Sequence, residues 1–320
     1  MLIGEVNTGL LQHSTSLPMA AAERLLSLVE GADVLSSQRP APYAVSPDIP
    51  VGVDCSLPSA SGRRVRGVGA VLSRALLSGG RVVQGSATAT IERSTAGRRL
   101  AWSHYIARAG HLEALGRPDW ADVTDGFLRP RPAPGGADAD ALDLGGIVNR
   151  LVDRVQSLDL VDRRAPLRTK RTHLRWAVTI DERFATAGSA RFTVESDGLR
   201  TMRMQLGEQD ATFAQSLCED LALHDWLLTE VTRRMEAAVS RGGPVTERVA
   251  TLRPFVEHLL HLWMPGARVA PEVVGVWEVF ERRPGFTRQW NASVEWIRDQ
   301  LAAGTATLLA AQAALPAGRS

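Results

Sequence analysis

Hydrophobic positions change their spacing along the chain, and the change divides the sequence near residue 207. Before this point the apolar runs are short: residues 65–77 and 81–92 favour strands, and residues 173–180 alternate between apolar and polar side chains. Such alternation is typical of a strand with one buried face. Beyond residue 207, apolar side chains recur every three or four positions, which predicts long helices.

Turn signals between the apolar runs predict how the strands connect. Ser78-Gly79-Gly80 joins the first two runs as a tight hairpin, because paired glycines supply the positive φ that such a turn needs. Asp197-Gly198 does the same between residues 191–195 and 199–206. Shorter elements complete this part of the chain: a strand at 1–11, a helix at 18–30 and an amphipathic helix at 144–158.

The two longest predicted helices carry apolar seams whose spacing alternates between four and three. In residues 212–240 the seam consists of Leu217, Leu221, His224, Leu228, Val231 and Met235. In the terminal helix it consists of Trp290, Val294, Ile297, Leu301, Gly304, Leu308, Ala311 and Leu315. Seams of this kind suit antiparallel helix packing, and Gly304 lets a neighbouring helix approach closely. Two further helices are expected between them, at 247–263 and 271–282.

Together these elements predict an α+β protein. Residues 1–207 form a curved, mainly antiparallel sheet with short helices, and residues 208–320 form an antiparallel helical bundle. Glycines inside the strands, such as Gly67 and Gly85, indicate strong curvature or a closely packed covering layer. The stretch 129–141, rich in Pro, Gly and Ala, is expected to be a mobile loop.

Composition and charge exclude several function classes. The 320 residues include 37 basic and 35 acidic side chains, so a net charge of +2 gives little bulk attraction to a polyanion. Lys170 is the single lysine, and its surroundings fit neither a Walker A loop nor a Schiff-base site. Cys55 and Cys218 lie far apart, which argues against a disulfide framework. With no signal-peptide pattern and no long apolar run, we expect a cytoplasmic protein without a membrane span.

His224 is the most informative polar residue, because its place in the seam predicts burial. Burial lowers the pKa of a histidine and requires a hydrogen-bond partner, and Asp220 lies one turn earlier on the same side of the helix. One interpretation is a general base or metal ligand. The other, which the sequence favours, is a structural core histidine held by Asp220 or by a neighbouring helix.

Other histidines suggest weaker candidates for catalysis. Ser103-His104-Tyr105, with His111 beyond, contains a nucleophile and a base, but adjacent strand residues point to opposite faces. Asp54-Cys55-Ser56 is a second candidate nucleophile site, without a histidine nearby in the sequence. We expect turn and packing roles for both clusters.

A metal site is not expected. Glu257, His258 and His261 lie within about one turn, but they occupy the arc opposite the apolar side chains of their helix. Their spacing also matches neither the His-Glu-x-x-His nor the Glu-x-x-His motif. The sequence predicts no cofactor.

Two features point to contacts with other macromolecules. The densest basic stretch spans residues 163–175, and its candidate contact residues are Arg163, Arg164, Arg168, Lys170 and Arg171. It suits phosphates or an acidic protein surface, although the near-neutral total charge and the lack of interleaved aromatic residues argue against nucleic acid. Trp226 lies about 160° from His224 on its helix, away from the seam, which indicates a second packing layer or a partner surface.

Several stretches carry a resemblance to a known family. They are GEVNTGLLQ at 4–12, VRGVGAV at 65–71 with VVQGSA at 82–87, WSHY at 102–105, LCEDLALHDWLLT at 217–229, HLLHLWMPGARV at 258–269, RPGFTRQW at 283–290 and IRDQL at 297–301. The chain resembles an actinobacterial family of conserved proteins that has no assigned function, over most of its length outside residues 129–141. Members of that family are encoded beside a variant P-loop protein and a methyltransferase-like protein, so the resemblance implies a multi-protein system. It implies no catalytic residue.

The sequence therefore favours a non-catalytic interaction or scaffold component of a multi-protein system. Two alternatives remain open. One is a hydrolase-type enzyme that uses His104, His111 or His224 with a carboxylate. The other is a weak nucleic-acid binder that uses residues 163–175. If the histidines converge with Asp54 or Cys55 in a concave pocket, the enzyme is favoured.

Overall fold

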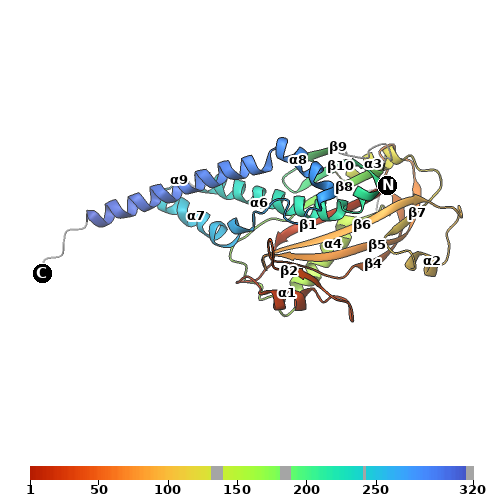
Figure 1. Cartoon of the computed structure of the whole chain (residues 1–320), viewed down its shortest axis with the longest axis horizontal. Coiled ribbons are helices and arrows are strands. Elements are labelled where there is room, and N and C mark those ends of the chain that lie inside the picture. The colour runs from red at the N-terminus through yellow and green to blue at the C-terminus, as the bar shows by residue number, and fades with distance from the viewer. Residues whose placement is uncertain (131–139, 181–188, 241–242, 315–320) are drawn as a thin grey trace.

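The structure of the chain is a computed structural model that describes residues 1–130, 140–180, 189–240 and 243–314. Its described part is α+β, as predicted, with a large sheet built mainly by the first part of the sequence and helices that pack together in the last part (Figure 1). The sequence boundary near residue 207 falls between the last strand, which ends at Leu206, and a helix that begins at Glu208. Most of the predicted loop, residues 131–139, lies outside the described residues.

The sheet contains ten strands in the described residues. Their spatial order is β2-β3-β5-β7-β6-β1-β8-β10-β9, and β4 pairs with β5 beside this path. Pairing is antiparallel except between β8 and β10 and between β6 and β7. The bounds are β1 Leu2–Leu10, β2 Leu35–Ser37, β3 Tyr43–Val45, β4 Ile49–Leu57, β5 Val65–Ser78, β6 Val82–Arg93, β7 His111–Leu115, β8 Thr172–Ile180, β9 Ser189–Val194 and β10 Leu199–Leu206.

Nine helices of α type and two short 3₁₀ turns complete the described residues. The bounds are α1 Met19–Leu26, α2 Trp102–Ile106, α3 Trp120–Leu128, α4 Leu144–Ser157, α5 Glu208–Ala211, α6 Ala214–Ser240, α7 Val245–His258, α8 Val274–Arg282 and α9 Phe286–Ala313, with η1 at Leu260–Leu262 and η2 at Pro271–Val273. No helix in these segments is long and apolar enough to cross a membrane.

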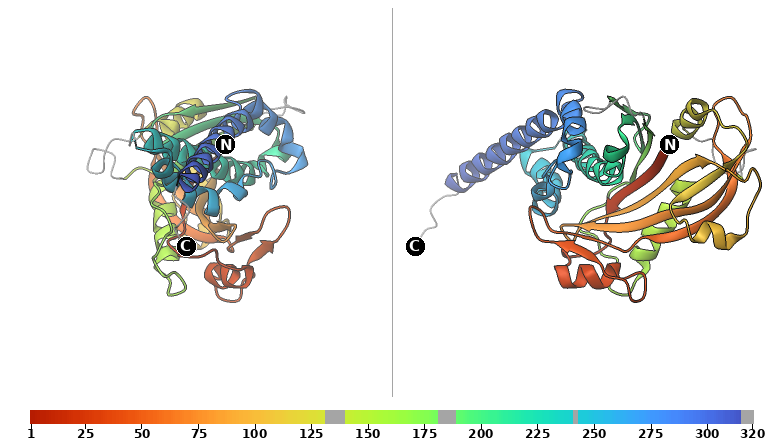
Figure 2. Two further views of the ribbon diagram at one scale, coloured as in Figure 1. Left: turned by 90° about the vertical axis from the view of Figure 1, so that its left-hand side faces the viewer. Right: turned by 45° about the vertical axis from the view of Figure 1, so that its right-hand side comes forward.

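The two faces of the sheet are covered by different helices, because side chains along a strand alternate between them. On β1, Ile3 and Glu5 point to the face that α4 covers, while Val6 and Leu10 join the apolar cluster of α6. We call these the α4 face and the α6 face (Figure 2). The predicted close covering of glycine is confirmed at Gly85 on β6, where an added Cβ would lie 2.8 Å from Val152 of α4.

The largest apolar cluster joins the sheet to the helices. Trp176 of β8 and Met202 of β10 lie in it together with Leu217, Leu221 and Trp226 of α6. Each of these side chains is fully buried. Burying apolar surface from both parts of the chain in one cluster stabilises the helices against the sheet.

Helices α7 and α9 both pack against α6, and they run antiparallel to each other. Phe255 near the end of α7 packs against Trp290 near the start of α9, with ring centroids 6.1 Å apart. At the other end, Gly304 of α9 faces the start of α7, where an added Cβ would lie 2.9 Å from Val249. The predicted close approach at Gly304 is therefore confirmed, whereas the last residue of that seam, Leu315, lies outside the described residues.

Candidate interaction site

The first candidate, the pair Asp220 and His224, is buried beneath the segment that follows η1. Both side chains are about 1% exposed. His224 Nδ1 lies 2.7 Å from the Asp220 carbonyl oxygen, so it donates one turn back along α6, and Nε2 accepts from the Met264 N–H at 3.2 Å. The Asp220 carboxylate accepts from the Gly266 N–H at 2.9 Å.

This arrangement makes His224 a structural group. Burial lowers the pKa of His224, although the Asp220 carboxylate opposes that shift. A neutral imidazole with one donating and one accepting nitrogen satisfies both bonds. The pair therefore connects α6 to the segment around Met264 and Gly266, and neither ring nitrogen is free to take a proton from a substrate.

Trp226 lies in the second packing layer rather than on a surface. Its side chain has no exposed area, and Nε1 donates to the Lys170 carbonyl oxygen at 2.9 Å. The residue lies off the seam because it packs toward the start of β8, on the side of α6 away from His224. This burial corrects the expectation of an accessible partner contact at Trp226.

The basic stretch 163–175 is only partly available to a ligand. Arg163, Arg164, Arg168 and Lys170 are exposed, whereas Arg171 pairs with Asp153 at 2.7 Å. The run ends inside the sheet, where the Arg175 side chain is buried beside Glu5. Four exposed cations in a connecting segment form a local patch and not a groove, so the structure adds nothing that selects a nucleic acid.

The histidines of the enzyme hypothesis do not all converge. His104 Nε2 lies 2.7 Å from the buried Glu113 carboxylate, and His111 Nδ1 lies 3.8 Å from Glu92 on the neighbouring strand. Ser94 and Arg108 also donate to Glu113, so this carboxylate already has three partners.

The side chains of Asp54 and Cys55 point to opposite sides of β4, the strand that carries both residues. Asp54 binds Arg66 and Arg99 on one side of β4, at 2.6 and 2.9 Å. Cys55 is buried in the apolar cluster on the other side, among residues packed against α4. Asp54 and Cys55 therefore do not form a shared site, and His224 lies elsewhere, on α6.

The weak metal motif on α7 is not assembled. Glu257 pairs with Arg253 at 2.6 Å, and His258 Nδ1 lies 3.3 Å from the Arg81 guanidinium. Burial and this cation both lower the pKa of His258. Within the described residues, no group of three or more His, Cys, Asp or Glu side chains is arranged to hold a metal ion.

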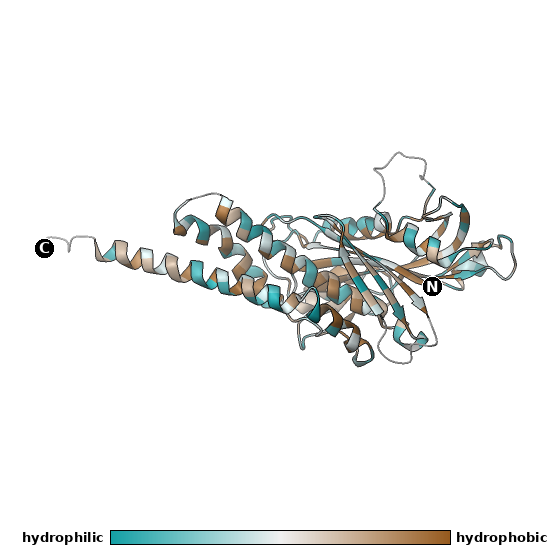
Figure 3. Cartoon of the chain, turned by 90° about the horizontal axis from the view of Figure 1, so that it is seen from above, coloured by the Kyte–Doolittle hydropathy of each residue, from teal (hydrophilic) through white to brown (hydrophobic). Residues whose placement is uncertain are grey.

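The most distinctive surface is the end of α9, which extends beyond the rest of the molecule (Figure 1). Residues 305–314, which we call the free end of α9, are all exposed, and they follow Gly304, the last buried position of the helix. Leu308 and Leu309 are 56% and 60% exposed. Residues 300–318 contain no charged side chain, and the projecting helix shows little hydrophilic colour (Figure 3).

The sequence predicts the α9 seam, but it does not show that the second half of the seam has no partner within the described chain. Leu308 and Ala311 continue the spacing that buries Trp290 and Ile297, yet α7 begins at Val245 and extends no further along the seam. The signal that marks this segment in the sequence is the uncharged run from residue 300 to residue 318. A solvent-exposed helix normally carries a charged face.

Comparisons of the chain with models of known protein families, with curated protein sequences and with solved structures find no match.

Proposed function

We propose that the protein is a non-catalytic interaction component that binds a partner protein through the free end of α9. The observation that carries this proposal is the projection of ten successive exposed residues, 305–314, without a charged side chain. Exposed apolar surface in a contiguous patch marks sites of association in soluble proteins. An amphipathic or apolar helix is a common form of such a ligand, because it fits a hydrophobic groove on its partner.

The lack of a charged face on any side of this helix favours binding in a groove of a different protein over pairing with a second copy of the chain. The free end consists of Ala, Thr and Leu, with Gln312 as the only larger polar side chain, so no side of it carries a charge. In a two-helix contact, each helix covers only one stripe of the other. A groove covers more of the circumference, as a helix without a charged face on any side requires.

The family resemblance supplies the candidate partners, namely the variant P-loop protein and the methyltransferase-like protein. In this proposal one of them carries the groove, and the chain links it to the other components as a scaffold. The absence of charge at the free end implies that the contact is driven by apolar burial, so we expect binding that changes little with ionic strength.

Affinity capture from the source organism tests the proposal. The tagged wild-type chain is compared with Leu308→Glu/Leu309→Glu, which places two charges on the free end. Arg163→Glu/Arg164→Glu is the matched control, with two exposed positions changed in the basic stretch. We expect the same few proteins with wild type and control, and their loss with the Leu variant.

The oligomeric state of the purified chain completes this test. Light scattering should show a monomer for both the wild type and the Leu308→Glu/Leu309→Glu variant. A wild-type dimer that this variant dissociates would show that a second copy occupies the free end and would overturn the hetero-partner proposal. Equal recovery of all captured proteins by the wild type and the Leu variant would overturn the role of α9.

One observation favours a second candidate, the hydrolase. His104 is held by the buried Glu113 carboxylate at 2.7 Å, and a carboxylate that orients a histidine is the arrangement of a general base. Its test is turnover of generic ester and phosphodiester substrates by the wild type and by His104→Ala. Activity that this variant abolishes would support the hydrolase, and no activity above background would remove it.

A further inference from the structure

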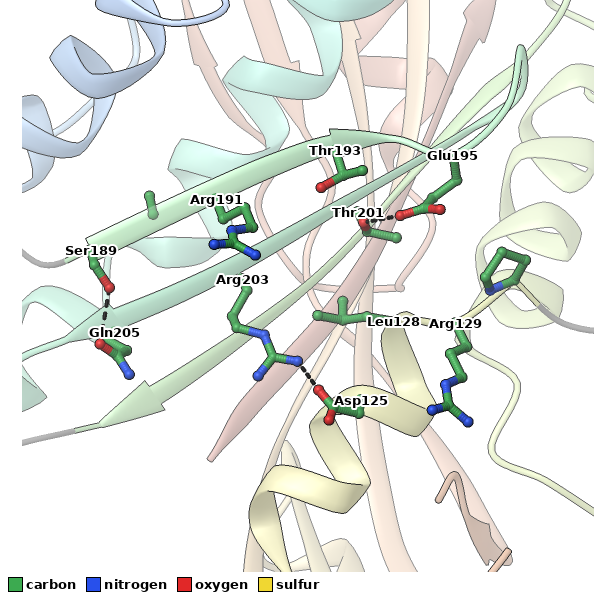
Figure 4. Close-up of a pocket in the computed structure, with 12 residues that line it drawn as sticks. Asp125, Leu128, Arg129, Ser189, Arg191, Thr193, Glu195, Thr201, Arg203 and Gln205 are labelled. Carbon is green, nitrogen blue, oxygen red and sulfur yellow. Dashed lines mark hydrogen bonds and ion pairs between the residues drawn. The ribbon is translucent and has the colours of Figure 1, made fainter. Parts of the chain in front are cut away.

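A second surface lies at the other side of the sheet, on the α4 face of β8, β10 and β9. Here α3, rather than α4, borders the strands, and the space between them is a groove of about 760 Å³ (Figure 4). Its lining is largely polar and includes the charged residues Asp125, Arg129, Arg191, Glu195 and Arg203 and the hydroxyl groups of Thr193 and Thr201. The opposite face of the same strands is apolar, because Met202 and Met204 alternate with these polar residues and point toward α6.

Two arginines face each other directly across neighbouring strands in this groove. Arg191 of β9 and Arg203 of β10 are register partners, and their side chains lie over the same face (Figure 4). Like charges at directly opposed positions repel and destabilise a sheet. Asp125 of α3 forms an ion pair with Arg203. Among the residues that the structure describes, no acceptor binds Arg191. The second carboxylate of the lining, Glu195, accepts instead from the Thr201 hydroxyl at 3.0 Å.

Hydroxyl and amide groups flank this arginine pair on both sides. Two residues along the strands in one direction, Thr193 pairs with Thr201. Two residues along in the other direction, Ser189 pairs with Gln205. Ser189 Oγ donates to Gln205 Oε1 at 2.9 Å, which leaves the Gln205 amide N–H groups for another acceptor. The groove thus places two cations between hydrogen-bonding groups, with the Glu195 carboxylate bound to Thr201 on one side of the pair.

A buried network holds the wall of the groove beside α3. Arg175 of β8, the register neighbour of Thr201, donates to Glu5 at 3.1 Å and to the Arg129 carbonyl oxygen at 2.9 Å. Burial alone would raise the pKa of Glu5, but His173 and Arg175 lower it below its usual value. The carboxylate therefore stays ionised, and Arg175 links Arg129, a residue of the wall, to the sheet.

We propose that this groove binds a small phosphorylated polyol, of the sugar-phosphate class. The planar guanidinium groups of Arg191 and Arg203 match phosphate oxygens in a forked geometry, and a dianion removes the repulsion between them. Thr193, Gln205 and the Glu195 carboxylate provide hydrogen bonds for the hydroxyl groups of the ligand. The described lining contains no aromatic side chain on which a base would stack, so a nucleotide is disfavoured.

Calorimetric titration of the full chain with glucose 6-phosphate, inorganic phosphate, glucose and citrate tests this proposal. We expect the tightest binding for glucose 6-phosphate, weaker binding for phosphate and none for glucose. Arg191→Ala should weaken glucose 6-phosphate binding by about tenfold or more, because it removes one charge-assisted contact. Arg24→Ala, which changes an exposed arginine on α1 outside the groove, should leave the affinity unchanged.

Three results would overturn the proposal. The first is no detectable binding of glucose 6-phosphate at millimolar concentration. The second is equal affinity for citrate and glucose 6-phosphate, which would show a general anion site. The third is an unchanged affinity in Arg191→Ala, which would place the ligand elsewhere. Because Arg191 is exposed, its replacement leaves the core intact, and circular dichroism checks the fold of the variant.

Discussion

Helices α6 and α9 are nearly equal in length, at 27 and 28 residues, and both carry a seam with alternating spacings of four and three. Along α6 the buried positions continue to Ala238, close to its end. Along α9 they stop at Gly304, and every described residue of the helix beyond it is exposed. The two helices thus share a sequence pattern but differ in how much of it the chain itself covers.

The difference shows what a seam does and does not specify. A seam predicts that a helix packs against something, but it does not say whether the partner belongs to the same chain. In α6 the partners are the sheet, α7 and α9. In α9 the chain supplies α7 and α6 for the first half only, so the second half is a surface without an internal partner among the described residues.

Trp226→Ala should give the largest effect and tests the buried helix. The side chain is completely buried and its Nε1 donates to Lys170, so we expect a loss of about 3–5 kcal/mol in the free energy of unfolding. Leu308→Ala on the free end of α9 is the comparison and should change this energy by less than about 0.5 kcal/mol. Denaturant unfolding followed by circular dichroism measures both. Similar losses in the two variants would remove the contrast between the helices.

Asp220→Ala tests the polar contact that α6 makes with the segment after η1. The change removes the acceptor for the Gly266 N–H and the charge that faces Arg268, 3.5 Å away. We expect a loss of about 2–3 kcal/mol in unfolding free energy, since hydrogen bonds to charged groups are worth more than neutral ones. Hydrogen exchange should show faster opening at Met264 and Gly266. If these amides stay protected, the buried pair does not hold the segment.

Asp225 makes the stability of α6 depend on pH. Burial raises its pKa from 3.8 to about 6, although Arg200 at 2.7 Å opposes the shift. Because its native pKa is raised, the folded state holds the Asp225 proton more tightly than the unfolded state. The contribution of Asp225 to the free energy of unfolding is therefore complete below pH 3.8 and is lost as the pH rises through about 6.

The comparison of wild type with Asp225→Asn isolates this group. Between pH 4 and pH 7, the unfolding free energy of the wild type should fall relative to that of the variant by about 2 kcal/mol. Urea titrations at several pH values give the difference. A constant difference across this range would mean that Asp225 keeps an ordinary pKa.

Leu308→Glu/Leu309→Glu should have the smallest effect on the free energy of unfolding, and it tests the exposed end of α9 as Trp226→Ala tests the buried α6. Both side chains are more than half exposed, so we expect a change below about 0.5 kcal/mol and an unchanged helix content. Thermal unfolding and far-ultraviolet circular dichroism test this. A large loss of stability would mean that the free end packs against the chain itself, and the account of α9 would be wrong.

The sequence predicts the fold class well because its strands and helices differ in period. The alternation in residues 173–180, the Gly79-Gly80 turn and the two seams each correspond to an observed element. The strand order is not accessible in the same way. The local pattern marks residues 1–11 as a strand, but it does not show that β6 and β8 lie on either side of β1, since pairing depends on contacts between distant segments.

The candidate sites are less predictable than the fold. The burial of His224 and its proximity to Asp220 follow from helix geometry, and the structure shows both. The Arg191 and Arg203 pair depends on the register of β9 against β10, which the Asp197-Gly198 turn suggests only approximately. The exposure of Leu308 depends on where α7 begins relative to α9. Each of these depends on tertiary placement, which local pattern does not encode.

Site-specific photocrosslinking at position 308 tests the central claim most directly. A photoreactive amino acid replaces Leu308, and in a control chain it replaces the exposed Arg163. After irradiation in the source organism, the account predicts a crosslink from position 308 to one protein other than this chain, and none to that protein from position 163. No crosslink from position 308, or a crosslink only to a second copy of the chain, would contradict it.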